Sequence, residues 1–165
     1  MKKIAWLGIS IIFLVSCKSN FKNSITLKKI DMVWLDSIIN RSDSSYTKNY
    51  NRTDFVTAQY FISTYDSTLL QIMKDSAQQI RKVILTENNI VKQRAQYYAN
   101  GQLMAAIKFN DKGQLTKYAI TYFENGSIAS QGNYLGGLKV GNWKEYDTNG
   151  NAKIIKYDST GVVIH

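Results

Sequence analysis

The chain has 165 residues, of which 44% are hydrophobic, and carries 21 Lys and Arg against 12 Asp and Glu, a formal charge of +9. It has one cysteine and one histidine, which excludes an intrachain disulfide, a cysteine-rich metal site and a Cys-His or Ser-His-Asp arrangement built on an internal histidine. The length suits a single domain with a sizeable core.

The first residues predict an exported lipoprotein. MKKIAWLGISIIFLVSC (1–17) begins with two lysines, continues with an uncharged apolar run, and ends with a small residue and Cys17, the pattern of a secretory signal peptide. The apolar run is shorter than the about 20 residues that a membrane-spanning helix needs. Its last four residues, LVSC, resemble the lipobox of bacterial lipoproteins, a family in which the peptide is cut before the cysteine and a diacylglycerol is joined to its sulfur. The resemblance implies a signal peptide over 1–16, acylation of Cys17, and anchoring in the bacterial cell envelope, at the outer membrane or the outer face of the inner membrane.

Removal of the signal peptide would leave 149 residues (165 minus 16) with a side-chain charge of +7, because two lysines are lost. The remaining lysines are scattered, so this charge mainly serves solubility. Nucleic acid is not expected as a partner of an exported protein.

The region before the main domain divides into three segments. Residues 17–30 have little aliphatic content and predict a lipidated, flexible tether. The apolar positions of DMVWLDSIIN (31–40) favour a short helix over alternation. Residues 41–54 are polar and predict a loop or long turn.

From Phe55 onward, runs rich in Val, Ile, Thr, Tyr and Phe are separated by turn clusters, which is the pattern of strands and hairpins. Strands are predicted over 55–63, 68–74, 80–86, 90–98, 102–109, 114–123, 127–135, 142–146, 151–157 and 162–165. No helical pattern long enough for a crossover lies between them, so the fold class is mainly β, an antiparallel hairpin meander. Alternation places two groups on shared faces: Leu103, Ala105, Ile107 and Phe109, and Tyr118, Ile120 and Tyr122.

Turn glycines recur at nearly fixed intervals. The motifs YANG, NDKG, FENG, DTNG and DSTG end at Gly101, Gly113, Gly126, Gly150 and Gly161. The spacing of 12, 13, 24 and 11 residues predicts stacked hairpin units, with Gly136 and Gly137 near the middle of the longest interval. Glycine supplies the positive φ that such turns need, and the rings before each turn are expected to stack on the next hairpin.

The stretch YFENGSIASQGNYLGGLKVGNWKEYDTNG (122–150) resembles the bacterial variant of the MORN repeat. The matching residues are Tyr122, Asn125, Gly126, Gly132, Tyr134, Gly137, Gly141, Trp143, Tyr146, Asn149 and Gly150. The clearest repeats span 97–161, within a single β-repeat domain over 31–165, and 31–90 are either divergent repeats or something different. The resemblance implies an elongated β-hairpin array, and MORN repeats are linked to protein partners and lipid binding. Some members are antitoxins of toxin–antitoxin pairs (YwqK-type), but a lipobox disagrees with a cytoplasmic antitoxin, so we retain only protein interaction.

The remaining chemical groups favour structural roles. His165 is the last residue and is interpreted as a solvent-exposed tail. Four carboxylates are expected to cap turns, in a row along one edge: Asp111, Glu124, Asp147 and Asp158. A glycosidase pair among them stays open, because only their spacing in space decides it. Trp143 and Tyr146 are assigned to packing between hairpins rather than to ligand contact.

Four lysines in the last repeats, Lys139, Lys144, Lys153 and Lys156, are interpreted as a solvated strand face, with a basic strip as the alternative. The sequence therefore predicts a lipid-anchored, non-enzymatic protein-interaction module without cofactor or metal. The alternatives are an immunity-type lipoprotein that neutralises a toxin and an envelope protein that binds lipid or cell-wall glycan.

Overall fold

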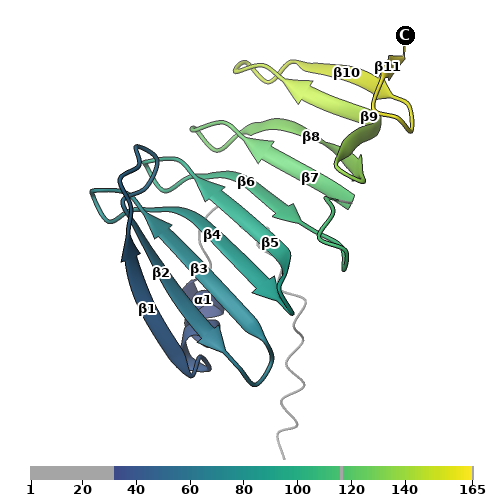
Figure 1. Cartoon of the computed structure of the whole chain (residues 1–165). Coiled ribbons are helices and arrows are strands. Elements are labelled where there is room, and N and C mark those ends of the chain that lie inside the picture. The colour runs from purple at the N-terminus through teal and green to yellow at the C-terminus, as the bar shows by residue number, and fades with distance from the viewer. Residues whose placement is uncertain (1–31, 116, 165) are drawn as a thin grey trace, which may run out of the picture.

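The computed structural model of the chain describes residues 32–115 and 117–164, and Figure 1 shows one helix followed by a long run of strands. The predicted signal peptide, the tether with Cys17, and His165 lie outside these residues. The elements are α1 (Met32–Asn40), β1 (Ser44–Asn49), β2 (Thr57–Ser63), β3 (Thr68–Lys74), β4 (Ile80–Glu87), β5 (Ile90–Tyr97), β6 (Leu103–Lys108), β7 (Lys117–Tyr122), β8 (Ile128–Leu135), β9 (Leu138–Tyr146), β10 (Ala152–Tyr157) and β11 (Val163–Ile164).

The eleven strands form a single sheet in which the spatial order is the order in sequence, from β1 to β11. The pairings between neighbouring strands are antiparallel, because the short connections permit hairpins and no crossover. The predicted fold class, a mainly β meander of hairpins, is confirmed.

Helix α1 packs on one face of the sheet at its N-terminal end, behind β2 to β4 in Figure 1. Leu35 and Ile38 are 1% and 0% exposed and join the core formed by the inward residues of β3 to β7. A nine-residue helix is about 14 Å long, whereas eleven strands at about 4.8 Å spacing extend roughly 48 Å. The helix therefore covers only one end of this face, which we call the helix-side face. In the part of the chain that the structure describes, no helix has the length and apolar character to cross a membrane.

The strand register shows which residues lie on the helix-side face from β3 to β10. One row of cross-strand partners on this face is Ile72, Val83, Ala95, Ala106, Ile120, Gln131, Lys144 and Ile154. The row is apolar from β3 to β7, continues with the polar Gln131 and the exposed Lys144, and ends at the exposed Ile154. The predicted shared face of Tyr118, Ile120 and Tyr122 is this one.

A second apolar cluster lies on the opposite face, near the C-terminal end. Trp143 is 1% exposed and lies against Gly132, where a Cβ would come within 2.4 Å of the indole ring. The Trp143 Nε1–H donates to the carbonyl of Asn133 (2.9 Å), and Tyr134 packs edge-on against the indole. This opposite face also buries Ala58 and Tyr60 of β2, so both faces of the sheet contain buried residues.

Six hairpin turns share one backbone pattern. In each turn, the N–H of the first residue donates to the carbonyl of the fifth, and the carbonyl of the first accepts from the N–H of the fourth. In the β9–β10 turn, for example, Asp147 N–H donates to Asn151 O (3.0 Å) and Gly150 N–H donates to Asp147 O (3.0 Å). The fourth position is glycine with positive φ at Gly101, Gly113, Gly126, Gly150 and Gly161. The sixth turn has Gln78 there, at φ 61°.

Consecutive turns alternate between the two ends of the strands, since each hairpin reverses the chain. Asp111 and Asp158 therefore lie at one end of the strands and Glu124 and Asp147 at the other. The prediction that the four carboxylates form a row along one edge is wrong.

Two further expectations are corrected. Residues 41–54 contain strand β1, which pairs with β2 and has all six residues exposed, so its sequence carries no apolar signal. Leu103 pairs with Tyr97 while Ala105 pairs with Gln96, because the register shifts between Gln96 and Tyr97. Leu103 and Ala105 therefore face opposite sides of the sheet, contrary to the predicted alternation.

Candidate functional site: an uncovered sheet surface

Beyond the reach of α1, the helix-side face of β7 to β10 exposes large apolar side chains. Tyr118 is 53% exposed, Leu135 57%, Leu138 48% and Ile154 61%. Strand register places these residues on one face: Tyr118 pairs with Asn133, two positions before Leu135, which pairs with Leu138. We call Tyr118, Leu135, Leu138, Lys144, Ile154 and Lys156 the uncovered surface.

A chain of side-chain hydrogen bonds holds the tyrosine of this surface in place. The Tyr118 hydroxyl donates to Oε1 of Gln131 (2.7 Å), and Nε2 of Gln131 donates to the Tyr146 hydroxyl (2.8 Å). The three residues come from β7, β8 and β9. A ring fixed before binding loses little conformational entropy when a partner packs on it, so Tyr118 is suited to be a contact residue.

The charge of the uncovered surface is positive. Lys144 is the cross-strand partner of Ile154, and Lys156 lies two positions further along the same face of β10; both lysines are exposed. Within β7 to β10 the one carboxylate is Glu145, which faces the other side, where it pairs with Lys139 (3.2 Å). Apolar groups and ammonium groups thus share a surface without acidic residues from these strands.

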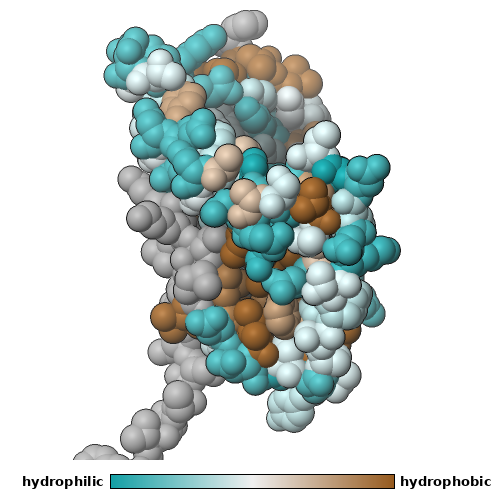
Figure 2. All heavy atoms as spheres, turned by 90° about the vertical axis from the view of Figure 1, so that its left-hand side faces the viewer, coloured by the Kyte–Doolittle hydropathy of each residue, from teal (hydrophilic) through white to brown (hydrophobic). Residues whose placement is uncertain are grey.

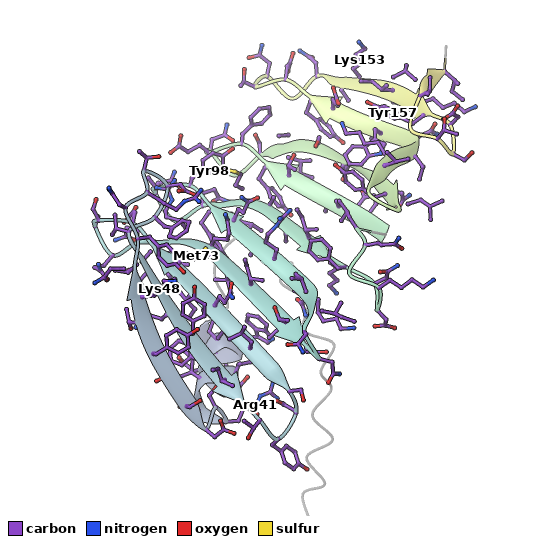
Figure 3. The ribbon with its side chains drawn as sticks, in the orientation of Figure 1. Arg41, Lys48, Met73, Tyr98, Lys153 and Tyr157 are labelled. Atoms are coloured by element: carbon purple, nitrogen blue, oxygen red, sulfur yellow. The ribbon has the colours of Figure 1, made fainter. Side chains whose placement is uncertain are left out.

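The four lysines of the last repeats are divided between the two faces. Lys139 and Lys153 lie on the face of Trp143, and Lys144 and Lys156 on the uncovered surface. The Lys139 ammonium group is 4.4 Å from the Trp143 ring centre and 5.6 Å from that of Tyr157, so it is part of the packing there. Figure 3 marks Lys153 and Tyr157 on β10. The lysines therefore do not form a single basic strip.

The predicted repeat residues occupy turns and the Trp143 cluster. Positive φ angles occur at Gly101, Gly113, Gly126, Gly137, Gly141, Gly150 and Gly161. Trp143 is buried, and Tyr146 ends the hydrogen-bond chain from Tyr118. The turns of β5–β6 and β7–β8 contact each other, since Tyr98 donates to the Tyr122 carbonyl (3.0 Å). The ring pairs among the described residues include one stacked pair, Tyr46–Tyr60, and two edge-on pairs, Tyr50–Phe55 and Tyr134–Trp143. None of these pairs involves a ring directly before a glycine turn, so the predicted ring stacking between successive hairpins stays a prediction.

The turn carboxylates differ in what they do. Oδ1 of Asp147 accepts from the N–H groups of Asn149 and Asn151, and Asp158 caps its turn in the same way. In the β6–β7 turn the cap is Asn110, and Asp111 instead pairs with Lys92 (2.7 Å). In the β7–β8 turn the cap is Asn125 rather than Glu124. Capping by Asp111 and Glu124 was wrongly predicted, because an Asx-type cap needs a short side chain at a particular turn position.

Hydrogen bonding lowers the pKa of the capping aspartates. The Asn151 side chain, and then the backbone N–H groups of the turn, stabilise the charged form of Asp147 and hold its pKa below the usual value. For Asp158 the first cause of the lowered pKa is the Thr160 hydroxyl. These shifts belong to turn structure and not to reaction chemistry.

The edge of the sheet at β1 is polar. Figure 2 looks toward this edge and shows mostly near-neutral and hydrophilic residues there, in keeping with the SSYTKN sequence of β1. Polar, lysine-bearing edge strands resist pairing with other chains. Of the large exposed apolar side chains, β1 carries Tyr46, whereas the uncovered surface carries Tyr118, Leu135, Leu138 and Ile154.

Sequence reasoning did not find the uncovered surface as a unit. The alternation of Tyr118, Ile120 and Tyr122 was a usable signal for one strand. No sequence pattern associates Gln131 and Ile154 with Tyr118, because only the register across the four strands β7 to β10 places these residues on the same face.

Comparisons with known proteins identify no family. No family model matches the chain, and no curated protein matches. Solved structures with a related arrangement include the crystal structure of TarM, with 16% identity and a TM-score of 0.41 over 82% of this chain. A second is a point mutant of S. aureus TarM in complex with fondaparinux, alpha-GlcNAc-glycerol and UDP, with 16% identity and a TM-score of 0.40 over 81% of this chain. This chain spans 25% of the length of each, and likeness at this level carries no argument about function.

Proposed function

We propose that the protein is a non-enzymatic, lipid-anchored module of the cell envelope that binds another protein through its uncovered surface. The single observation that supports this is the exposure of Tyr118, Leu135, Leu138 and Ile154 on one sheet face. Leu135 and Leu138 are direct cross-strand partners, whereas Ile154 lies beside Lys144, six residues along β9 from Leu138. Large apolar side chains exposed together on one face mark interaction sites.

The chemistry of the surface favours an acidic protein as the partner. Lys144 and Lys156 are exposed beside Ile154, and strands β7 to β10 place no carboxylate on this face. A partner that presents aspartate or glutamate around an apolar centre would be complementary in charge and would associate faster at low salt. The fixed Tyr118 ring adds a preorganised aromatic contact.

Site-specific photocrosslinking tests the proposal with a matched control. A photoreactive amino acid replaces Ile154 in one variant and Lys153 in another; both positions are exposed, adjacent in β10, and on opposite faces. In intact cells we expect a discrete crosslinked protein from position 154 and none, or a much weaker one, from position 153. Identification of the crosslinked band by mass spectrometry gives the partner, and a toxin there would select the immunity-type function.

Charge reversal separates specific binding from general stickiness. Lys144→Glu combined with Lys156→Glu is expected to remove the crosslink from position 154, whereas Lys153→Glu should leave it unchanged. Equal crosslinking from both faces, or a crosslink that survives the double charge reversal, contradicts the proposed docking surface.

A further inference from the structure

A hollow of about 400 Å³ lies at the other end of the molecule, where the end of α1 meets the sheet. It is lined by Trp34, Arg41, Asp66, Thr68, Leu85, Glu87 and Gln93. Its volume is in the range of small-ligand sites, which is about 300–1,000 Å³. It is separate from the uncovered surface, which lies on β7 to β10.

The fold assembles the hollow from four places in the chain. Thr68 and Glu87 are direct cross-strand partners at adjoining ends of β3 and β4, and Leu85 pairs with Gln93 of β5. These strand residues line the sheet side of the hollow, on the face that α1 covers. Asp66 comes from the β2–β3 turn, and Figure 3 shows Arg41 at this end of the molecule, close to that turn.

The hollow has carboxylate oxygens with unused capacity to accept hydrogen bonds. Oδ1 of Asp66 is shielded from solvent and has no hydrogen-bond partner among the described residues. Oδ2 of Asp66 is 3.7 Å from Nε of Arg41, a loose ion pair rather than a hydrogen bond. Because the Asp66 side chain is 32% exposed while its Oδ1 is shielded, Oδ2 is the oxygen that a donor in the hollow can reach, and a hydrogen bond to this charged group would be stabilising.

The Asp66 carboxylate carries a negative charge at neutral pH, because its pKa lies below the usual aspartate value. Burial raises the pKa of Asp66, but the nearby hydroxyl groups of Ser63 and Thr68 and the charge of Arg41 together bring that pKa below its usual value. With one arginine against Asp66 and Glu87, the hollow is acidic. An anionic ligand would be repelled, and a ligand rich in hydroxyl or ammonium donors would be favoured.

We propose that this hollow binds a sugar or amino sugar, whose hydroxyl or ammonium groups donate to Asp66 and Glu87 while its apolar ring face contacts Trp34. The indole supplies the apolar part of the lining together with Leu85, and Gln93 and Thr68 add polar groups that can both donate and accept. An apolar wall with a few placed polar groups is the usual composition of a site for a small polar ligand.

Titration of the full-length protein with named sugars tests this inference. D-glucose and D-glucosamine are added while the Trp34 indole N–H signal is followed by NMR, after its assignment from the Trp34→Phe variant. We expect saturable shifts of the Trp34 signal with at least one of the two, and no shift of the buried Trp143 signal. Tighter binding of glucosamine would show that an ammonium group is the main donor, and equal binding that hydroxyl groups suffice.

Two variants and one control connect binding to the carboxylates. Asp66→Asn and Glu87→Gln should each weaken the affinity about tenfold or more, the scale of a hydrogen bond to a charged group. Glu124→Gln, at a distant turn, should bind as the unmodified protein does. D-glucuronate should bind more weakly than glucose. Absence of any saturable Trp34 shift, or affinity unchanged in both Asp66→Asn and Glu87→Gln, would overturn the assignment.

Discussion

At the scale of single residues, the contact between Gly132 and Trp143 controls the C-terminal cluster. Gly132 has an ordinary backbone conformation, so its lack of a side chain matters for space and not for φ. The indole occupies the position where a Cβ would lie, and neighbouring backbone fixes the ring through the Asn133 carbonyl. The glycine is therefore needed for the close approach of β9 to β8.

We predict that Gly132→Ala lowers the free energy of unfolding by about 1–3 kcal/mol, the usual cost of overpacking. Gly150→Ala is the matched control, because Gly150 has φ 87° and open space around it, so its cost is backbone strain of about 1 kcal/mol. Urea unfolding followed by Trp fluorescence measures both variants. If Gly132→Ala unfolds at the same urea concentration as the unmodified protein, the close contact with Trp143 is not rigid.

The capping aspartates make stability depend on pH. Because the pKa of Asp147 is lower in the folded protein than in the unfolded chain, its stabilising effect is complete above the unfolded pKa of about 3.9 and disappears as the pH falls through the folded pKa. Asn110 caps the β6–β7 turn with the same two hydrogen bonds, so asparagine is a compatible replacement.

We therefore predict that, when the pH falls from about 5 to about 2, the range in which carboxylates titrate, the free energy of unfolding decreases less in Asp147→Asn than in the unmodified protein. Urea unfolding at several pH values measures the difference. NMR titration of the Asp147 carboxyl group provides an independent check, and a midpoint at or above the usual aspartate value contradicts the prediction.

At the scale of elements, α1 and the hairpins use different sources of stability. Each hairpin is supported by its turn and its neighbour, whereas a nine-residue helix is unstable alone in water and depends on packing. Leu35 and Ile38 provide this packing against the core residues of β3 and β4, such as Leu70 and Leu85.

Leu35→Ala is expected to reduce the free energy of unfolding by about 2–5 kcal/mol, as for other buried leucines. Val33, on the same helix, is 80% exposed, and Val33→Ala should change stability by less than about 0.5 kcal/mol. Urea or thermal unfolding distinguishes the two. A small effect of Leu35→Ala would mean that α1 contributes little to the core.

At the scale of the whole molecule, one helix packs on one end of a long sheet, and residues 32–115 and 117–164 place no second layer over the rest of that face. The two ends differ in chemistry: an acidic hollow lies beside α1, and a cationic apolar surface lies on β7 to β10. If a lipid is attached at Cys17, then α1 and the strands beside it are the elements closest in sequence to the attachment point.

We predict that Cys17→Ser releases the protein from the membrane fraction, since one acylated cysteine is the proposed attachment point. Fractionation of cells followed by immunoblotting measures the distribution, and Ser19→Ala is a control that keeps the cysteine. Continued membrane retention of Cys17→Ser would contradict lipid anchoring through this residue.

Particular elements show how far sequence reasoning reached. The turns at Gly101, Gly113, Gly126, Gly150 and Gly161 were predictable because glycine takes the positive φ that such turns need without steric cost, and other residue types do not. β1 was not, because an edge strand with six exposed residues has no apolar alternation. The carboxylates at Asp111 and Glu124 resembled caps in spacing, although the short Asn110 and Asn125 side chains make the hydrogen bonds.

The sequence by itself determined much of the local structure: where the chain turns, which segments from Phe55 onward are strands, and that successive strands pair as hairpins. The tertiary structure decided which face each strand buries, because register shifts such as that between Gln96 and Tyr97 move neighbouring residues to opposite sides. It also decided where α1 packs, and thereby which part of the sheet stays uncovered. The physical reason is range: turn preferences act within a few residues, whereas burial depends on contacts between residues far apart in the chain.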